Sequence, residues 1–239
     1  MENKIIKILE KIFLIIELFI FGLYLIPEYF DLTIHYDNFK VLFFLIVVIF
    51  LESFIYFRQW SKENLIVRIG FFFTLCADYL MTYLNKHYIL SICFFFLAQL
   101  SYFILINFLF SKKYLKSSII SYCSLVVLLI VIGSILKVLD PLSITAIIYI
   151  SLSLTNIIYL IRIKNKTNSI KKFLLGLILF LLCDLCIGLR NIGLKDGMFI
   201  EIISECIWIF YAPSQMILVQ TLSNIELVKG ELYEESIKS

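Results

Sequence analysis

Long apolar runs separated by short polar stretches follow one another along the whole chain. Each run has about 19–25 residues, which matches the roughly 20 that a helix needs to cross a membrane. Apolarity is uniform within a run, whereas a strand of a membrane barrel alternates polar and apolar residues over roughly ten positions. The pattern predicts eight transmembrane helices, near residues 5–26, 39–57, 66–84, 88–110, 119–139, 142–161, 173–194 and 198–222.

The composition excludes a water-soluble fold. Residues of the types AVILMFWYC fill 62% of the 239 positions and charged residues only 16%, whereas a soluble domain is roughly 45–50% apolar. One span with its connection takes about 30 residues, so eight spans use the whole chain. We therefore expect an all-α, polytopic membrane protein in which residues 1–239 form a single transmembrane domain, an eight-helix bundle.

The positive residues are distributed unevenly between the two ends of the runs. Sixteen of the 21 Lys and Arg residues lie on the side that would hold both chain ends, and Arg190 lies inside a run. The other side receives only Lys40, Lys86, Lys137 and Lys195. Because Lys and Arg resist translocation, both termini are predicted to be cytoplasmic, and we expect the cytoplasmic membrane of a bacterium. The net charge of +3 is then a topology signal and no footprint of nucleic-acid binding.

Cysteine and histidine give no sign of a metal or redox centre. All six cysteines fall within predicted spans, where we expect free thiols. Cys183 and Cys186 form a CxxC without a neighbouring His, which favours a packing role. His35 and His87 are isolated, and the chain has no P-loop, GxSxG or dinucleotide motif. We therefore expect neither a metal nor another cofactor.

A few polar residues lie deep in the predicted spans, where an ionisable side chain costs several kcal/mol unless it faces a partner or a cavity. Asp78, Gln99 and Asp184 are each near the middle of a different span. A polar layer of this kind is what a buried pocket for a small molecule or part of a lipid requires. Hydrogen bonding between helices is the alternative role for all three.

Helical spacing adds further residues to these positions, because side chains three, four or seven apart share a face. The additions are Thr74 and Thr82 beside Asp78, Tyr102 beside Gln99, and Gly188 and Asn191 beside Asp184. The last span carries a stripe at spacings of four, three and four, made by Ser204, Trp208, Tyr211 and Gln215. An aromatic stripe often serves packing, which is the favoured role of Trp208.

Other charged residues within the runs allow simpler interpretations. Glu10 and Glu17 stand seven apart near two lysines, so they predict either one paired face of the first helix or a functional group at Glu17. Glu52 can reach towards Arg58 at the cytoplasmic end. Arg190 can extend to the outer interface, or hold a phosphate with its bidentate fork.

Four short motifs occur in order along the chain: CADYLM in the third span, AQLSY in the fourth, LFLLCDLCIGLRN in the seventh and YAPSQMILV in the eighth. Together they resemble the lysoplasmalogenase family, also called the YhhN family, in order and in span count. The matching positions are Asp78, Gln99, Tyr102, Asp184, Tyr211 and Gln215. The chain departs from the family pattern at Ala77, where Gly is usual, at Cys183, where Ser is usual, and at Gln99, where His is frequent.

The resemblance implies that the substrate is a lysophospholipid whose vinyl-ether bond is hydrolysed. The other expected partners are membrane lipids, and we expect no nucleic-acid partner. The sequence does not give the oligomeric state. Such hydrolysis needs a protonated acid and a nearby anion. Two buried carboxyls can supply both, since burial favours the protonated form and repulsion disfavours two charges. Asp78 and Asp184 are the predicted acid–base pair, in undetermined order. The residues expected to orient substrate and water are Gln99, Tyr102, Asn191, Tyr211 and Gln215.

Two other classes of function use the same residues. A lipid flippase or proton-coupled transporter can bind its cargo or a proton at midplane carboxylates, and each half of the chain carries an Asp span followed by a Gln span. A scaffold or sensor without catalysis is disfavoured, because it does not need charge at the midplane.

Overall fold

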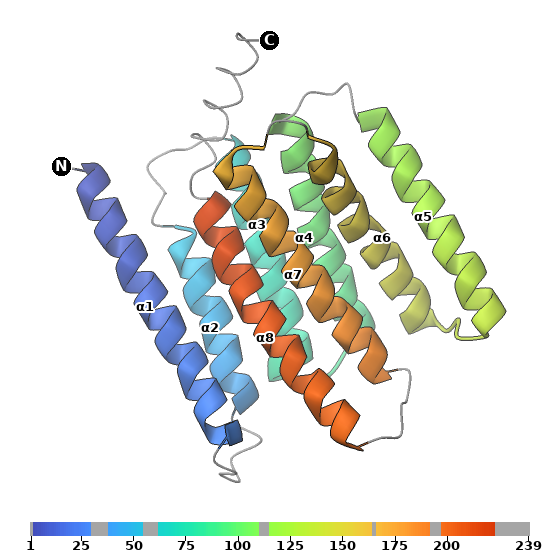
Figure 1. The fold of residues 1–239 in the computed structure, drawn as a ribbon, viewed down its shortest axis with the longest axis horizontal. Helices are drawn as coiled ribbons and strands as arrows, with labels where there is room; N and C mark the ends of the chain where they lie inside the picture. Colours follow the sequence, from blue (N-terminus) through green and yellow to red (C-terminus); the bar gives the residue numbers. More distant parts are fainter. Residues whose placement is uncertain are drawn as a thin grey trace. The chain divides into compact units, whose positions relative to one another are not determined.

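The computed structural model describes residues 2–29, 38–54, 62–109, 115–163, 166–191 and 197–222. These residues are all-helical, with eight α-helices and one π-helical turn, η1 (Figure 1). In chain order the elements are α1 (Glu2–Tyr29), α2 (Asn38–Glu52), α3 (Lys62–Asp78), η1 (Tyr79–Tyr83), α4 (Tyr88–Leu109), α5 (Leu115–Leu136), α6 (Pro141–Arg162), α7 (Asn168–Asn191) and α8 (Gly197–Leu222).

The eight helices follow the eight predicted apolar runs in order, so the all-α class is confirmed for the described residues. Six helical segments are long and apolar enough to cross a membrane: Asn64–Tyr83, Tyr88–Leu109, Leu115–Leu136, Pro141–Arg162, Asn168–Arg190 and Ile202–Thr221. The other two helices differ from these. Charged residues, among them Glu10, Lys11 and Glu17, interrupt α1, and α2 has only 15 residues. Eight spans and cytoplasmic termini therefore stay predictions.

Large apolar side chains are exposed on most of the helices. On α5 the only buried residues are Ser118 and Gly133, and the exposed ones include Val127, Leu128 and Ile135. In water such a surface is unfavourable, whereas lipid tails are as apolar as these side chains. Together with the six apolar helices, this indicates a multi-pass membrane protein.

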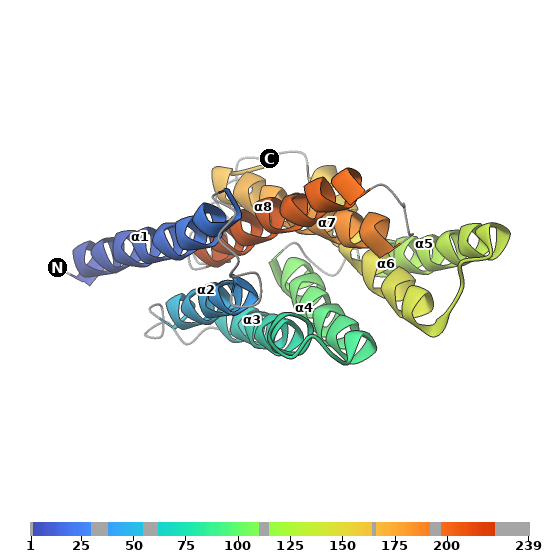
Figure 2. The ribbon, with the colours of Figure 1, turned by 90° about the horizontal axis from the view of Figure 1, so that it is seen from below.

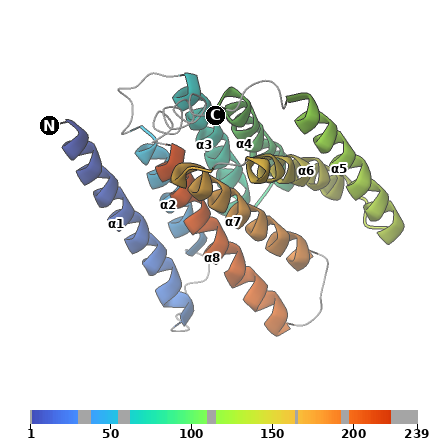
Figure 3. The same ribbon diagram turned by 45° about the horizontal axis from the view of Figure 1, so that its top comes forward.

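The chain divides into two compact units, which we call unit 1 (Met1–Thr155) and unit 2 (Asn156–Ser239). In unit 1, α1 packs on α2, α2 packs on α3 and η1, and α3 packs on α4 (Figure 2). In unit 2, α7 and α8 lie side by side along most of their length (Figure 3). The helix α6 contributes its first part to unit 1 and its last turns to unit 2.

Small residues bring α3 and α4 together. A Cβ atom at Gly70 would lie 3.3 Å from Ser101 Cβ and 3.7 Å from the carbonyl oxygen of Ala98. Towards the other end of the pair, Ser91 Oγ donates a hydrogen bond of 2.8 Å to the carbonyl of Ala77. Small residues and hydroxyl groups are the usual means of helix packing in membranes, and these two contacts fix the register of the antiparallel pair.

A glycine also sets the distance between α7 and α8. A Cβ atom at Gly176 would lie 2.8 Å from Cγ of Leu218 and 3.4 Å from the carbonyl oxygen of Ser214. Because Leu218 is fully buried, this contact leaves no room for a side chain at position 176. Gly188, further along α7, has no atom within 4 Å of the same constructed position.

The start of α6 is capped by the residues before it. Asp140 Oδ1 accepts a hydrogen bond of 2.7 Å from the backbone N–H of Ser143, and Pro141 occupies the first helical position, where its fixed φ suits a helix. Hydrogen bonds from the side chain and then the backbone of Ser143 hold the pKa of the Asp140 carboxyl below its usual range.

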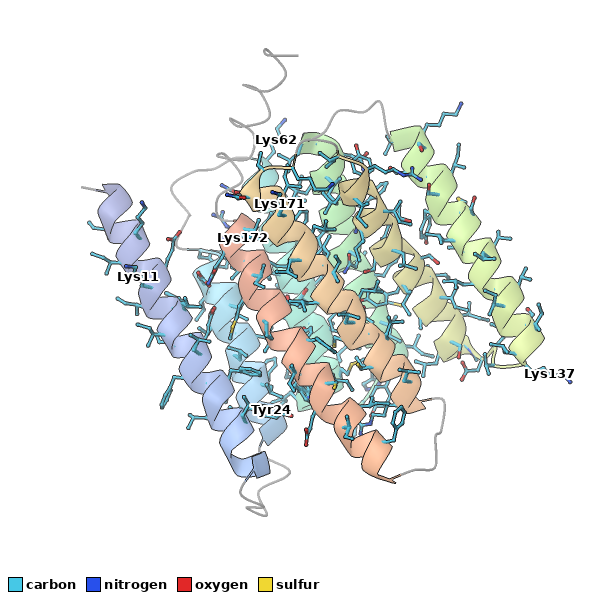
Figure 4. The ribbon with its side chains drawn as sticks, viewed as in Figure 1. Lys11, Tyr24, Lys62, Lys137, Lys171 and Lys172 are labelled. Atoms are coloured by element: carbon cyan, nitrogen blue, oxygen red, sulfur yellow. The ribbon has the colours of Figure 1, made fainter. Side chains whose placement is uncertain are left out.

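Figure 4 places lysines near the helix ends. Lys62 is the first residue of α3, and Lys137 follows the last residue of α5. Lys171 and Lys172 lie near the start of α7. All four side chains are exposed.

Candidate functional site

Asp78 is buried where α3 changes into a π-helical turn. Its side chain is 3% exposed, and η1 begins at the next residue, with the N–H of Leu84 donating to the carbonyl of Tyr79 over 2.9 Å. A π turn inserts an extra residue and is frequent at functional sites. The local backbone therefore departs from a regular helix directly beside the carboxyl.

Before this turn in the chain, a polar residue of α3, Thr74, faces a polar residue of α4, Tyr102. Tyr102 is fully buried, close enough to Thr74 for their hydroxyl groups to interact, and packs edge-on against Phe71 with ring centroids 6.5 Å apart. Thr74 Oγ1 donates to the carbonyl of Gly70. Gln99 on the same helix as Tyr102 is also fully buried. Both residues predicted on α4 thus lie in the interior.

The predicted common level of Asp78 and Gln99 needs correction. The hydrogen bond from Ser91 to Ala77 places Asp78 beside the first turns of α4, while Gln99 lies near its middle. The two backbone positions differ by two helical turns, which is about 11 Å along the axis. The sequence estimate took 66–84 as the span, but α3 begins at Lys62, so Asp78 lies nearer the end than the middle.

In unit 2, the carboxyl residue Asp184 is buried on α7. Its side chain is 8% exposed. The contact of Gly176 with Ser214 and Leu218 sets an antiparallel register that puts Asp184 at the level of Trp208. Trp208 packs edge-on against Tyr211 at 5.9 Å, which agrees with its predicted packing role.

Tyr211 and Gln215 are buried on the inner face of α8. Phe180 of α7 packs edge-on against Tyr211 with ring centroids 5.5 Å apart. Gln215 Nε2 donates to Ser214 Oγ over 3.3 Å, whereas Gln215 Oε1 has no hydrogen-bond partner among the described residues. Pro213 stands between these residues inside the helix and supplies no N–H to the preceding turn. The segment thus combines a buried amide oxygen with an interrupted hydrogen-bond ladder.

The remaining predicted residues contribute less to these clusters. Thr82 lies in η1 and is half-buried, as are Gly188 on α7 and Ser204 on α8. Asn191 is the last residue of α7, and its side chain lies outside the described residues. Arg190 beside it is exposed in the last turn.

Asp78 belongs to unit 1 and Asp184 to unit 2. Their predicted meeting in one cavity therefore stays a prediction. Each unit holds one buried carboxyl, one buried tyrosine and one buried glutamine, and we call each set of three a half-site: Asp78, Tyr102 and Gln99 in unit 1, and Asp184, Tyr211 and Gln215 in unit 2. The members of a set share burial and a pair of packed helices, but they lie at different levels along those helices. A buried carboxyl can carry a proton, and buried hydroxyl and amide groups can orient a polar group.

No group of three His, Cys, Asp or Glu side chains in the described part of the chain is arranged to hold a metal ion. All six cysteines are free, and the thiols of Cys186 on α7 and Cys206 on α8 lie near each other. This proximity agrees with the register derived from Gly176.

Two features were missed from the sequence. The π turn after Asp78 has no signal in the residues YLMTY. The second feature is a carboxyl pair, because Glu17 of α1 lies against Glu52 of α2, whereas we predicted a partner at Arg58, outside the described residues, for Glu52. Glu10, Glu17 and Tyr24 recur at intervals of seven and therefore lie on one face of α1. This spacing is the sequence pattern that could have indicated a buried polar face on α1.

Comparisons with known proteins give one result. No curated protein and no solved structure matches the chain. The model of the YhhN family matches residues 38–222, a stretch that contains all four sequence motifs, runs from α2 to α8 and leaves α1 outside. Because the match covers well over half of the 239 residues, the chain belongs to the YhhN family.

Proposed function

We propose that the chain is a membrane-embedded ether hydrolase that cleaves the vinyl-ether bond of lysoplasmalogens and releases a fatty aldehyde and a glycerophospho-alcohol. The observation that carries the proposal is that Asp78 and Asp184 are buried and lie within the stretch that matches the YhhN family, which includes lysoplasmalogenases. Buried carboxyls are costly in a membrane, so a reaction that uses them gives a reason for their presence.

The proposed reaction adds one water and needs only proton transfers. One Asp, in its acid form, gives a proton to the alkene carbon remote from the ether oxygen, which leaves an oxocarbenium ion. The other Asp, ionised, stabilises this cation and accepts a proton from the water that attacks it. The resulting hemiacetal breaks its carbon–oxygen bond to the glycerol part, giving an aldehyde and a free hydroxyl group. The proton taken from water restores the starting charge of the pair.

The neutral polar residues would orient the reactants. Buried hydroxyl and amide groups of Tyr102, Gln99, Tyr211 and Gln215 are donors and acceptors for the water and the ether oxygen. The unpartnered Oε1 of Gln215 is an acceptor for a water proton. We also assign Asn191, at the end of α7, to the substrate's polar part.

The proposal includes an arrangement in the membrane. The lysophospholipid would enter from the surrounding lipid into a single domain, residues 1–239, that crosses the cytoplasmic membrane of a bacterium eight times with both ends inside. The uneven distribution of Lys and Arg supports this orientation. Reporter fusions at residue 239 and within 195–197 should give opposite locations, and the same location for both would refute eight spans.

The function is tested by aldehyde release from a defined lysoplasmalogen by purified protein in lipid. The wild type should release aldehyde, and Asp78→Asn and Asp184→Asn should each lose most of the kcat, since general acid–base groups contribute about 10²–10⁴-fold. Asp140→Asn is the matched control, because Asp140 lies outside the spans and Asn also caps a helix. Proton-dependent lipid movement without aldehyde release would instead support a transporter.

A further inference from the structure

The helix α1 lies outside the stretch that matches the family and packs along α2 (Figure 1). Most of its surface is exposed and apolar, with Ile8, Ile15, Leu18 and Phe19 among the exposed residues. Among the described side chains of α1, the buried ones are Glu17 and Tyr24. These two residues are seven positions apart. The face of α1 that meets the rest of unit 1 therefore carries a carboxyl group in the middle of the helix.

That carboxyl meets another one. Glu52, the last residue of α2, and Glu17 are both 0% exposed, and their side chains lie close enough to interact directly. No hydrogen-bond donor among the described residues reaches any of the four carboxyl oxygens. Two buried acids thus face each other without the N–H or O–H groups that buried carboxylates normally require.

The charged groups around the pair do not replace such donors. Glu10 of α1 also acts electrostatically on Glu52, and its charge is of the same sign. Arg68 of α3 donates from Nε to the carbonyl of Ser53 over 3.2 Å, and its guanidinium lies 5.6 Å from the ring of Phe54. The element η1, which also packs on α2, has no charged residue. The lysines of α1 and α3 with described side chains, Lys7, Lys11 and Lys62, are exposed.

Two ionised carboxylates in this position would repel each other at low dielectric, and neither would recover the hydration it has lost. One proton between them removes one charge and creates the missing donor, an O–H group that one carboxyl gives to the other. Hydrogen bonds between a carboxylic acid and a carboxylate are short and strong, about 2.5–2.7 Å. A single bound proton therefore gives the two carboxyl groups a hydrogen bond, which no other described group supplies.

We propose that Glu17 and Glu52 form a proton-binding site that holds one shared proton and thereby attaches α1 to α2. This site is separate from the two half-sites around Asp78 and Asp184, and it does not depend on the proposed hydrolase activity. Its ligand is a proton. Loss of that proton leaves two negative charges between α1 and α2, so the attachment of α1 weakens in alkaline solution.

The proton itself is tested by infrared spectroscopy of the full chain in lipid. The wild type at neutral pH should show a carbonyl band of a protonated carboxyl group that Glu17→Gln removes and Glu205→Gln, a change of an exposed glutamate on α8, leaves in place. The band should disappear as the pH rises. A wild-type spectrum that Glu17→Gln and Glu52→Gln both leave unchanged would overturn the proposal.

The attachment is tested by the distance between spin labels at Phe19 and Leu51, which are 65% and 53% exposed on α1 and α2, in a variant whose native cysteines are serine. The short distance found at neutral pH should be lost at high pH. In Glu17→Gln it should persist at all pH values, because the amide donates to Glu52 without titrating. A wild-type distance that does not change with pH would overturn the proposal. A distance that changes with sodium or potassium concentration at constant pH would also overturn it, because the ligand would then be a metal cation.

Discussion

Replacing Gly176 by alanine should separate α7 from α8 and thereby disturb the half-site of unit 2. The new Cβ atom would lie 2.8 Å and 2.9 Å from Cγ and Cδ2 of Leu218, and real Cβ contacts are longer. Leu218 is fully buried and cannot turn aside into open space. Either the leucine leaves its packed position or the two helices move apart.

The magnitude follows from two opposing terms. Overpacking a well-packed contact costs about 1–3 kcal/mol, while alanine is better than glycine in a helix interior by about 0.5–1 kcal/mol. We expect a net loss of about 1–2 kcal/mol in the free energy of unfolding. Gly188→Ala on the same helix is the matched control, because nothing lies within 4 Å of its Cβ position. There only the helix term acts, so the change should be neutral or stabilising.

The assay measures the free energy of unfolding of the purified protein in mixed micelles. Unfolding is reversible and is driven by an increasing proportion of a denaturing detergent. Gly176→Ala should unfold earlier than the wild type and Gly188→Ala no earlier. In the double variant Gly176→Ala/Leu218→Ala, the loss should be smaller than the sum of the two single losses by about 0.5–3 kcal/mol, the usual coupling of residues in contact. Additive losses, or equal effects of the two glycine variants, would refute the packing argument.

Three further changes test other parts of the structure. Ser91→Ala removes the hydrogen bond to the carbonyl of Ala77 and should lower the free energy of unfolding by about 1 kcal/mol, measured by the same assay; no loss would mean that this bond does not secure the α3–α4 register. Asp140→Ala removes the cap of α6 and should lower the unfolding midpoint at neutral pH. The pKa of the Asp140 carboxyl is held below its usual value of about 3.9. The stability that this carboxyl adds is therefore complete above about pH 3.9 and is lost as the pH falls through the depressed pKa. The unfolding midpoints of the wild type and Asp140→Ala should converge in acid, and a difference that stays constant with pH would contradict the assignment. Gln99→His restores the side chain frequent in the family and should keep or raise aldehyde release, whereas inactivation would show that Gln99 belongs to a differently arranged site.

The order and approximate bounds of the helices were predicted from the sequence because their main cause, long apolar runs, is local. The eight runs predicted the eight helices in order, although α7 begins at Asn168, five residues before the predicted start. Charged and polar residues such as Lys171 and Lys172 placed that boundary too late, since hydropathy detects the apolar part of a helix and a helix can extend beyond it.

The burial of the candidate residues was predicted more reliably than their geometry. Burial of Asp78, Gln99 and Asp184 follows from their position in apolar runs. The relative depth of Asp78 and Gln99 did not, because the register of α3 on α4 is set by contacts at Gly70 and Ser91 that no local pattern reveals. The partner of Glu17 was missed for the same reason, since it depends on which helix α1 packs against.

The most direct test of the proposed function is the rate of aldehyde release from a defined lysoplasmalogen by the purified wild type and by Asp78→Asn and Asp184→Asn, each shown to be folded. We predict activity in the wild type and in Asp140→Asn, and a fall in kcat of about 10²-fold or more in each of the two buried variants. A fall of less than tenfold in both Asp78→Asn and Asp184→Asn, or no aldehyde release by the wild type, would contradict the assignment of these carboxyls to catalysis.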